Sequence, residues 1–236
     1  MSDELTLKTT NRPGGLAADT DPSAHARLAA RLEAEGYRVF WEPVDARAWG
    51  WQHFGAWFNG LTEAERRGLE DYIEHGQKIG AALRHGLAWS RRFIQDMDAM
   101  LYETRAPEAV ALTRLWMFRP SPLLHACLAA LQPGDVFTDR AFLSTSIGWT
   151  WGLEKQFQDG RSRLPSVILV RPGTRFLPLW GRWRPGAPTN ELWRHEVLLP
   201  RDFPLHLRER ADENNCYRLI FEALDEAAMS PLALSS

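Results

Sequence analysis

Residues 134–146 read GDVFTDRAFLSTS, and residues 194–200 read RHEVLLP. Before the first stretch the apolar residues recur with helical spacing, whereas after it they form short, strand-like runs. Helices early in the chain and strands late favour an α+β fold with antiparallel or mixed sheets. The same order argues against a doubly wound α/β fold, in which the two kinds of element alternate.

The helices expected before residue 134 have recognisable boundaries. A first helix from Pro22 to Glu35 ends at a glycine, and a second begins at Thr62, where Thr62 and Glu65 form the pattern of a capping box. A third helix begins near Ser90, and a fourth opens at Ser121-Pro122 with serine at the N-cap. The strand-like runs cover residues 112–118, 167–170, 197–199, 203–207 and 217–221.

Composition excludes several classes of protein. With 44% hydrophobic and 25% charged residues among 236, the chain can bury a sizeable core. No apolar run approaches the roughly 20 residues of a membrane helix, so we expect no membrane insertion. A net charge of −2 does not indicate a generally basic nucleic-acid binder. The two cysteines and seven histidines lack metal-ligand spacing, so we expect no metal.

The expected organisation is one folded domain behind a tail. Residues 1–21 show no periodicity and are predicted to be a flexible tail, without the apolar core of a Sec signal peptide. Residues 22–236 are predicted to form a single domain, helical over about 22–110 and β-rich over about 111–225. We expect synthesis in the cytoplasm, with secretion or injection into a target cell left open.

Three motifs occur in a telling order. Phe118-Arg119 ends a strand-like run, Phe142 to Ser146 contains Ser-Thr-Ser, and Glu196 is followed by Val-Leu-Leu-Pro. Together they resemble the ADP-ribosyltransferases of the arginine–serine–glutamate class, which include bacterial toxins and injected effectors. Upstream, the segment 61–65 with Tyr72 and Leu83-Arg84 resembles the leading helix of that family. The resemblance covers roughly residues 60–225.

The resemblance implies an ADP-ribosyltransferase-like fold, in which two packed, mostly antiparallel sheets form an NAD cleft behind N-terminal helices. It also implies mono-ADP-ribosyl transfer from NAD to a macromolecule, with release of nicotinamide. Its catalytic residues would be Glu196, Ser144 and Arg119. The NAD-contacting residues would be Arg119, Phe118, Ser144, Thr145, Ser146 and Phe142.

The chemistry of NAD explains why one carboxylate can suffice. Nicotinamide leaves a cationic ring as a neutral molecule, so no general acid is needed, unlike in most glycosidases. Positive charge develops on the ribose, and Glu196 would stabilise it through a hydrogen bond to a ribose hydroxyl. Ser144 would orient the nicotinamide ribose, and the fork of donors on Arg119 would hold the diphosphate or the adjoining ribose.

One position departs from the family pattern. The family usually has Glu or Gln two residues before the catalytic glutamate, and this chain has Arg194. A guanidinium cannot accept a hydrogen bond from a target arginine and would repel it. Arginine modification in the usual manner is therefore not expected. An acidic, hydroxyl or nucleic-acid acceptor, or hydrolysis of NAD, is favoured by this departure.

The segment before Glu196 is expected to recognise the target. It is a loop shaped by proline and glycine, and its aromatic and basic side chains suit bases and phosphates, a protein interface, or anchoring to the core. Its candidate recognition residues are Trp180, Arg182, Trp183, Arg184, Trp193 and Arg194.

Three functions stay open at this point. The first is a mono-ADP-ribosyltransferase, as a bacterial effector or toxin, with a protein acceptor favoured over nucleic acid. The second is an NAD glycohydrolase that depletes NAD. The third is a catalytically degenerate binding module that docks through the Trp/Arg loop. An immunity protein or a chaperone is left open as a further partner.

Overall fold

The computed structural model describes residues 22–117, 122–149, 163–179, 196–211 and 219–224. Its helices are α1 (Pro22–Ala34), α2 (Pro43–Gly60), α3 (Glu63–Arg84), α4 (Arg91–Glu103) and α5 (Pro122–Ala130). Its strands are β1 (Val110–Met117), β2 (Val136–Asp139), β3 (Leu143–Ser146), β4 (Arg163–Val170), β5 (Leu177–Leu179), β6 (Glu196–Leu199), β7 (Phe203–Arg210) and β8 (Leu219–Ala223).

The described strands form one sheet in the order β2-β7-β8-β4-β1-β3-β6-β5. Only β4 and β8 run parallel, and every other pair is antiparallel. The predicted α+β fold with mostly antiparallel strands is thus confirmed. The two expected sheets are joined, because β1 and β3 share one paired position, Thr113 with Ser146. That narrow junction separates β3, β6 and β5 from the remaining strands.

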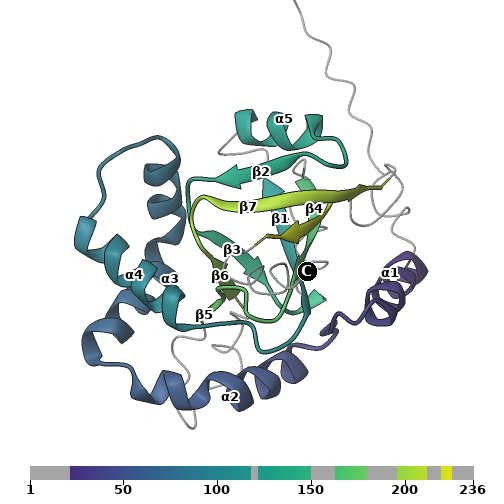
Figure 1. Cartoon of the computed structure of the whole chain (residues 1–236). Helices are drawn as coiled ribbons and strands as arrows, with labels where there is room; N and C mark the ends of the chain where they lie inside the picture. The colour runs from purple at the N-terminus through teal and green to yellow at the C-terminus, as the bar shows by residue number, and fades with distance from the viewer. Residues whose placement is uncertain (1–21, 118–121, 150–162, 180–195, 212–218, 225–236) are drawn as a thin grey trace, which may run out of the picture.

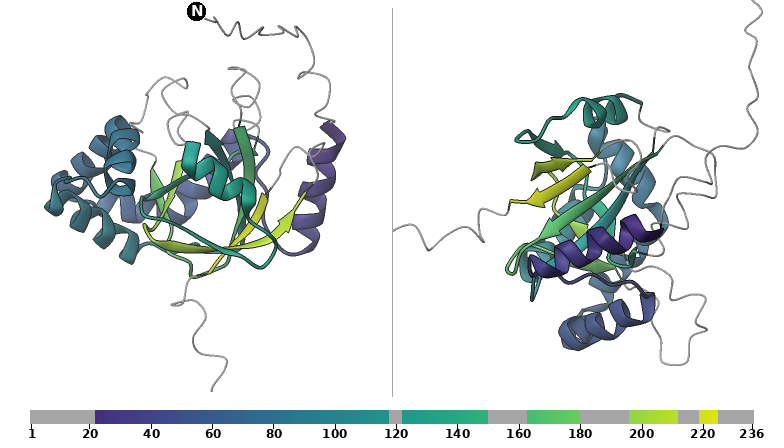
Figure 2. Two further views of the ribbon diagram at one scale, coloured as in Figure 1. Left: turned by 90° about the horizontal axis from the view of Figure 1, so that it is seen from above. Right: turned by 90° about the vertical axis from the view of Figure 1, so that its right-hand side faces the viewer.

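The helices surround the sheet (Figure 1). Helices α3 and α4 lie together beside β5 and β6, whereas α1 lies at the opposite side, and the view from above shows the same arrangement (Figure 2). The apolar faces of α3 and α4 pack against Phe142, Leu177, Leu179 and Leu198. Helix α1 packs instead against Ala111, Val167, Leu169 and Ile220. Residues from α3 therefore reach the strands that carry Ser144 and Glu196.

Local sequence signals account for the helix starts. The hydroxyl of Thr62 accepts a hydrogen bond from the backbone N–H of Glu65, and the carboxylate of Glu65 accepts one from the backbone of Thr62. This reciprocal pair is the predicted capping box. Ser90 caps α4 in the same way through the N–H of Phe93. Both predicted starts are confirmed, and each cap satisfies a backbone N–H of the first helical turn.

The tryptophans at the start of the chain mostly pack into the core. Trp49 is buried and contacts Phe40, Phe54 and Phe176, while its indole N–H donates to Glu108. These contacts hold α2 against the sheet and confirm packing over ligand binding for this side chain. Trp51 differs, because 39% of it is exposed.

Candidate active site

Ser144 and Glu196 meet on neighbouring strands. Strand β3 pairs antiparallel with β6, and the hydroxyl Oγ of Ser144 donates a hydrogen bond to Oε1 of Glu196. Both residues are half-buried. The structure therefore brings together the serine and the glutamate that the motifs singled out, although 52 residues separate them in the sequence.

The other residues of the Ser-Thr-Ser segment turn to the protein itself. The hydroxyl of Thr145 donates to the carbonyl oxygen of Val197 at 2.9 Å, and that of Ser146 donates to the carbonyl of Gly148 at 3.1 Å. Phe142 is buried and packs edge-to-face with Tyr72. These three side chains make contacts within the protein that support β3, and their contact with NAD stays a prediction.

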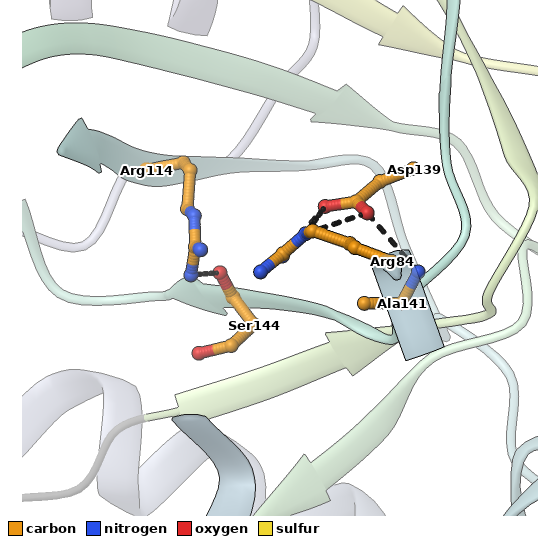
Figure 3. A network of polar contacts seen from close by, with 5 residues as sticks. All are labelled: Arg84, Arg114, Asp139, Ala141 and Ser144. Atoms are coloured by element: carbon orange, nitrogen blue, oxygen red, sulfur yellow. Dashed lines mark hydrogen bonds and ion pairs between the residues drawn. The ribbon is translucent and has the colours of Figure 1, made fainter. Parts of the chain in front are cut away.

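Arg114 is the arginine that the structure places beside this pair. It comes from β1, and its Nη1 donates a hydrogen bond to the carbonyl oxygen of Ser144 (Figure 3). Burial lowers the pKa of Arg114, and the positive charge of Arg84 lowers it further, while Asp139 and Glu196 act in the opposite direction. The guanidinium remains charged, because the pKa of arginine starts so far above neutrality.

A second arginine approaches from α3. Nε of Arg84 lies 2.9 and 3.1 Å from Oδ1 and Oδ2 of Asp139, and its Nη2 lies 2.7 Å from Oδ2. Asp139 is 5% exposed and also accepts a hydrogen bond from the N–H of Ala141. Figure 3 shows the guanidinium of Arg84 between Asp139 and the pair Arg114–Ser144. Asp139 thus supplies the negative charge that lets two guanidinium groups lie close together.

Tyr72 completes the side chains around the pair. It comes from α3, and burial raises the pKa of its phenol well above the ordinary value. The negative charge of Glu196 raises that pKa further, whereas Arg114 and Arg84 lower it. The phenol is therefore neutral at physiological pH and lies within electrostatic reach of Glu196 and both arginines.

Several predicted residues lie outside the described part of the chain. Among these are Phe118 and Arg119, together with the recognition residues Trp180, Arg182, Trp183, Arg184, Trp193 and Arg194. The segment 180–195 is still located by its ends, because it joins β5 to β6 and Leu179 pairs with Glu196. Target recognition by these side chains stays a prediction.

Sequence reasoning missed Arg114, Arg84 and Asp139 as parts of one cluster. One signal was available: Arg114 is the single charged residue in the apolar run of β1, VALTRLWM. A charge inside a buried strand is costly unless it is paired or used, so it marks a candidate functional residue. No sequence signal connects Asp139 to Arg84, because their contact depends on how α3 meets β2.

The described residues contain no feature that matches a metal site or a membrane-spanning helix. No group of three or more His, Cys, Asp or Glu side chains there is arranged to hold a metal ion. No helix in the same part of the chain is long and apolar enough to span a bilayer. The charges that gather around Ser144 and Glu196 instead combine two carboxylates, Glu196 and Asp139, with two guanidinium groups. The forked donors of arginine suit an anionic substrate, and a fixed carboxylate suits positive charge that develops on it.

Solved structures with a similar fold are bacterial ADP-ribosylating proteins. The C3 exoenzyme of Clostridium limosum aligns with a TM-score of 0.60 and 20% identity, covering 81% of this chain and 98% of its own. C3stau2 from S. aureus, solved with NAD, gives 0.57 and 16%, covering 80% and 97%. Exoenzyme S from Pseudomonas aeruginosa, solved with human 14-3-3 protein beta and Carba-NAD, gives 0.53 and 22%, covering 78% and 84%.

Sequence comparisons agree at the level of the family. A search of curated proteins gave no match. The model of the ADP-ribosyltransferase exoenzyme family, in contrast, matches residues 46–227, which include α3, every described strand and the Ser144–Glu196 pair. The chain therefore belongs to the ADP-ribosyltransferase exoenzyme family.

Proposed function

We propose that Glu196, Ser144 and Arg114 are the catalytic residues with which this NAD-dependent mono-ADP-ribosyltransferase cleaves NAD. The observation that carries the proposal is the contact of all three at one place: Ser144 binds Glu196 through its side chain and Arg114 through its carbonyl oxygen. Membership of the family supplies the reaction, and this geometry supports the assignment of its residues.

Glu196 stabilises the positive charge that develops on the ribose as nicotinamide leaves. A fixed carboxylate near that charge lowers the barrier without any reorganisation of solvent. The hydroxyl of Ser144 holds one carboxylate oxygen, which fixes the orientation of the group before substrate arrives. Because nicotinamide departs as a neutral molecule, no second carboxylate is required as a general acid.

Arg114 and Arg84 supply positive charge for the diphosphate of NAD. Arg114 contacts the carbonyl oxygen of Ser144, and Arg84 lies between that contact and Asp139, so two arginines balance the carboxylates of Asp139 and Glu196. A diphosphate carries the charge and the acceptor oxygens that match the forked donors of arginine. The residues present thus fit NAD as the substrate.

Arg119 remains the arginine that the sequence motif favours. It follows β1 by two residues and lies outside the described part of the chain. We prefer Arg114 because its guanidinium contacts Ser144, and comparison of substitutions at the two positions decides between them.

The proposed acceptor is a protein side chain of a type other than arginine. Arg194 stands where members of this class that modify arginine usually carry glutamate, and its charge repels a guanidinium. Trp180, Trp183, Trp193, Arg182 and Arg184 in the segment that leads into Glu196 would contact that protein. The similar solved structures are bacterial exoenzymes and toxins, which supports action in a target cell.

Hydrolysis of NAD is the second candidate, and Arg194 is again the observation that favours it. If no macromolecular acceptor is recognised at that position, water attacks the anomeric carbon of the ribose instead. Such an enzyme would release free ADP-ribose and label no macromolecule.

Labelled NAD separates these functions. The protein and its Glu196→Ala variant are incubated with a cell lysate, and each reaction is divided between protease and nuclease. A transferase acting on proteins gives label that needs Glu196 and disappears with protease. Label lost with nuclease would mean a nucleic-acid acceptor, and free ADP-ribose alone would mean a glycohydrolase. No consumption of NAD would contradict the enzymatic proposal and leave a binding module.

A further inference from the structure

Helix α3 carries an unusual series of glycines, which we call the glycine series. Gly68, Tyr72, Gly76, Gly80 and Arg84 follow one another at intervals of four residues. Successive members lie about 40° apart around the helix, so Tyr72 and Arg84 each have a glycine as their neighbour one turn away. Glycine weakens the interior of a helix, which makes its repeated use here a feature to explain.

The ring of Tyr72 occupies the space that a side chain at position 76 would take. A Cβ on Gly76 would lie 3.1 Å from Cε1 and 3.4 Å from Cζ of Tyr72. The ring is also confined on another side, because it packs edge-to-face with Phe142 at 5.9 Å between centroids and is 3% exposed. It therefore has little room to move away from an added methyl group.

Arg84 uses the next glycine in a similar way. A Cβ on Gly80 would lie 3.4 Å from Nη1 of Arg84 and 3.7 Å from Cβ of Ala141. An arginine end is ordinarily flexible, but Asp139 holds this one through both Nε and Nη2. The contact at Gly80 is thus looser than the contact at Gly76, yet it lies against a guanidinium that is already fixed.

These contacts direct two side chains toward each other along the helix. The ring of Tyr72 extends toward Gly76, and Nη1 of Arg84 reaches back toward Gly80. Both groups therefore lie along the stretch of helix between positions 72 and 84. Tyr72 packs on Phe142, which directly precedes β3, and the guanidinium of Arg84 lies between Asp139 and the contact of Arg114 with Ser144, so both α3 side chains border the site. The glycines consequently set how α3 presents its functional groups to the site.

We propose that Gly76 and Gly80 are positioning residues for NAD cleavage, acting through Tyr72 and Arg84. This proposal rests on the proposed function of the site. A methyl group at position 76 displaces the ring of Tyr72 from its place on Phe142, and one at position 80 presses more weakly, because it meets Nη1 of Arg84 at the edge of ordinary contact. Neither glycine touches the substrate.

Alanine substitutions in the same glycine series provide the test, with Gly68→Ala as the matched control. A Cβ on Gly68 meets nothing nearer than Cε of Met100 at 3.9 Å, which is ordinary contact. We expect Gly68→Ala to raise the melting temperature by about 2 °C through better helix propensity and to leave kcat/KM for nicotinamide release within about twofold. We expect Gly76→Ala to lower kcat/KM by about tenfold or more, since small misplacements are costly, and Gly80→Ala to raise KM for NAD.

A second pair of variants tests whether Gly76 acts through the ring. In a Tyr72→Ala background, Gly76→Ala meets no ring, so it should cause no further loss of kcat/KM. This comparison stands even if Gly76→Ala alone folds poorly. Equal kcat/KM for Gly76→Ala and Gly68→Ala, or a further loss in the double variant, would overturn the proposal. A wild-type protein that does not cleave NAD would instead overturn the proposed function, and the role of the glycines with it.

Discussion

The hydroxyl of Ser144 donates a hydrogen bond to the carboxylate of Glu196 across two paired strands. The bond fixes one oxygen of the carboxylate from within the protein. Preorganisation of this kind is the main way in which a single carboxylate can stabilise developing positive charge.

Loss of the serine hydroxyl should act through the glutamate. We expect Ser144→Ala to lower kcat for nicotinamide release by about 10-fold to 100-fold, because the carboxylate loses its fixed orientation. In a Glu196→Gln background the same substitution should cost much less, since residues that act as a unit are not additive. Steady-state kinetics of the four proteins measures this coupling. Equal losses in both backgrounds would show that Ser144 does not act through Glu196.

Two arginines compete for the third catalytic position. Arg114→Lys keeps a charge but loses the forked donors that reach the carbonyl of Ser144. We expect it to reduce kcat/KM by about 10-fold or more. Arg119→Lys should reduce it less, and the same assay compares them. The reverse order would return the catalytic role to Arg119.

Asp139 should matter for folding as well as for the site. Removing its charge leaves Arg84 partly buried and facing Arg114, so Asp139→Asn should lower the free energy of unfolding by about 2–3 kcal/mol. Urea unfolding measures the change. The exposed pair Arg92–Asp96 offers a matched control, because its atoms lie 3.9 Å apart in solvent and Asp96→Asn should cost at most about 0.5 kcal/mol. Similar losses for both variants would contradict the role given to Asp139.

Tyr72 makes stability depend on alkaline pH. Burial and Glu196 raise the pKa of its phenol in the folded protein, whereas the unfolded chain has the ordinary value near 10.0. The stability it contributes is therefore complete below pH 10 and is lost as pH rises above it, at up to about 1.4 kcal/mol per pH unit.

Absorbance of tyrosinate at high pH checks this prediction, since the chain has only four tyrosines. Tyr72 should ionise only as the protein unfolds, and Tyr72→Phe should remove that late step. Ionisation of Tyr72 near pH 10 in the folded protein would contradict the burial and the electrostatic interactions assigned to it.

Helix boundaries were the part of the fold most accessible from sequence. Thr62 with Glu65 and Ser90 carry short-range signals, because a cap needs only residues within one turn. The short strands β2, β3 and β5 have three or four residues each and too little periodicity to be recognised. Their existence depends on pairing with strands far away in the chain.

The candidate site divides in the same way. Ser144 and Glu196 lie in motifs whose letters and order are visible, so the sequence could single them out. Arg84 and Asp139 meet only because α3 packs beside the sheet, and their 55-residue separation leaves no local pattern. Arg114 is an intermediate case. Its lone charge in an apolar strand was visible in the sequence, but its contact with Ser144 was not.

The central claim is that Glu196 stabilises the cleavage of NAD, and nicotinamide release by wild type and Glu196→Gln tests it most directly. Glutamine keeps the size and an acceptor for Ser144 but removes the negative charge. We predict that release falls by about 100-fold to 1,000-fold while calorimetry shows NAD affinity within about threefold of wild type. A Glu196→Gln protein that releases nicotinamide at the wild-type rate would contradict the claim.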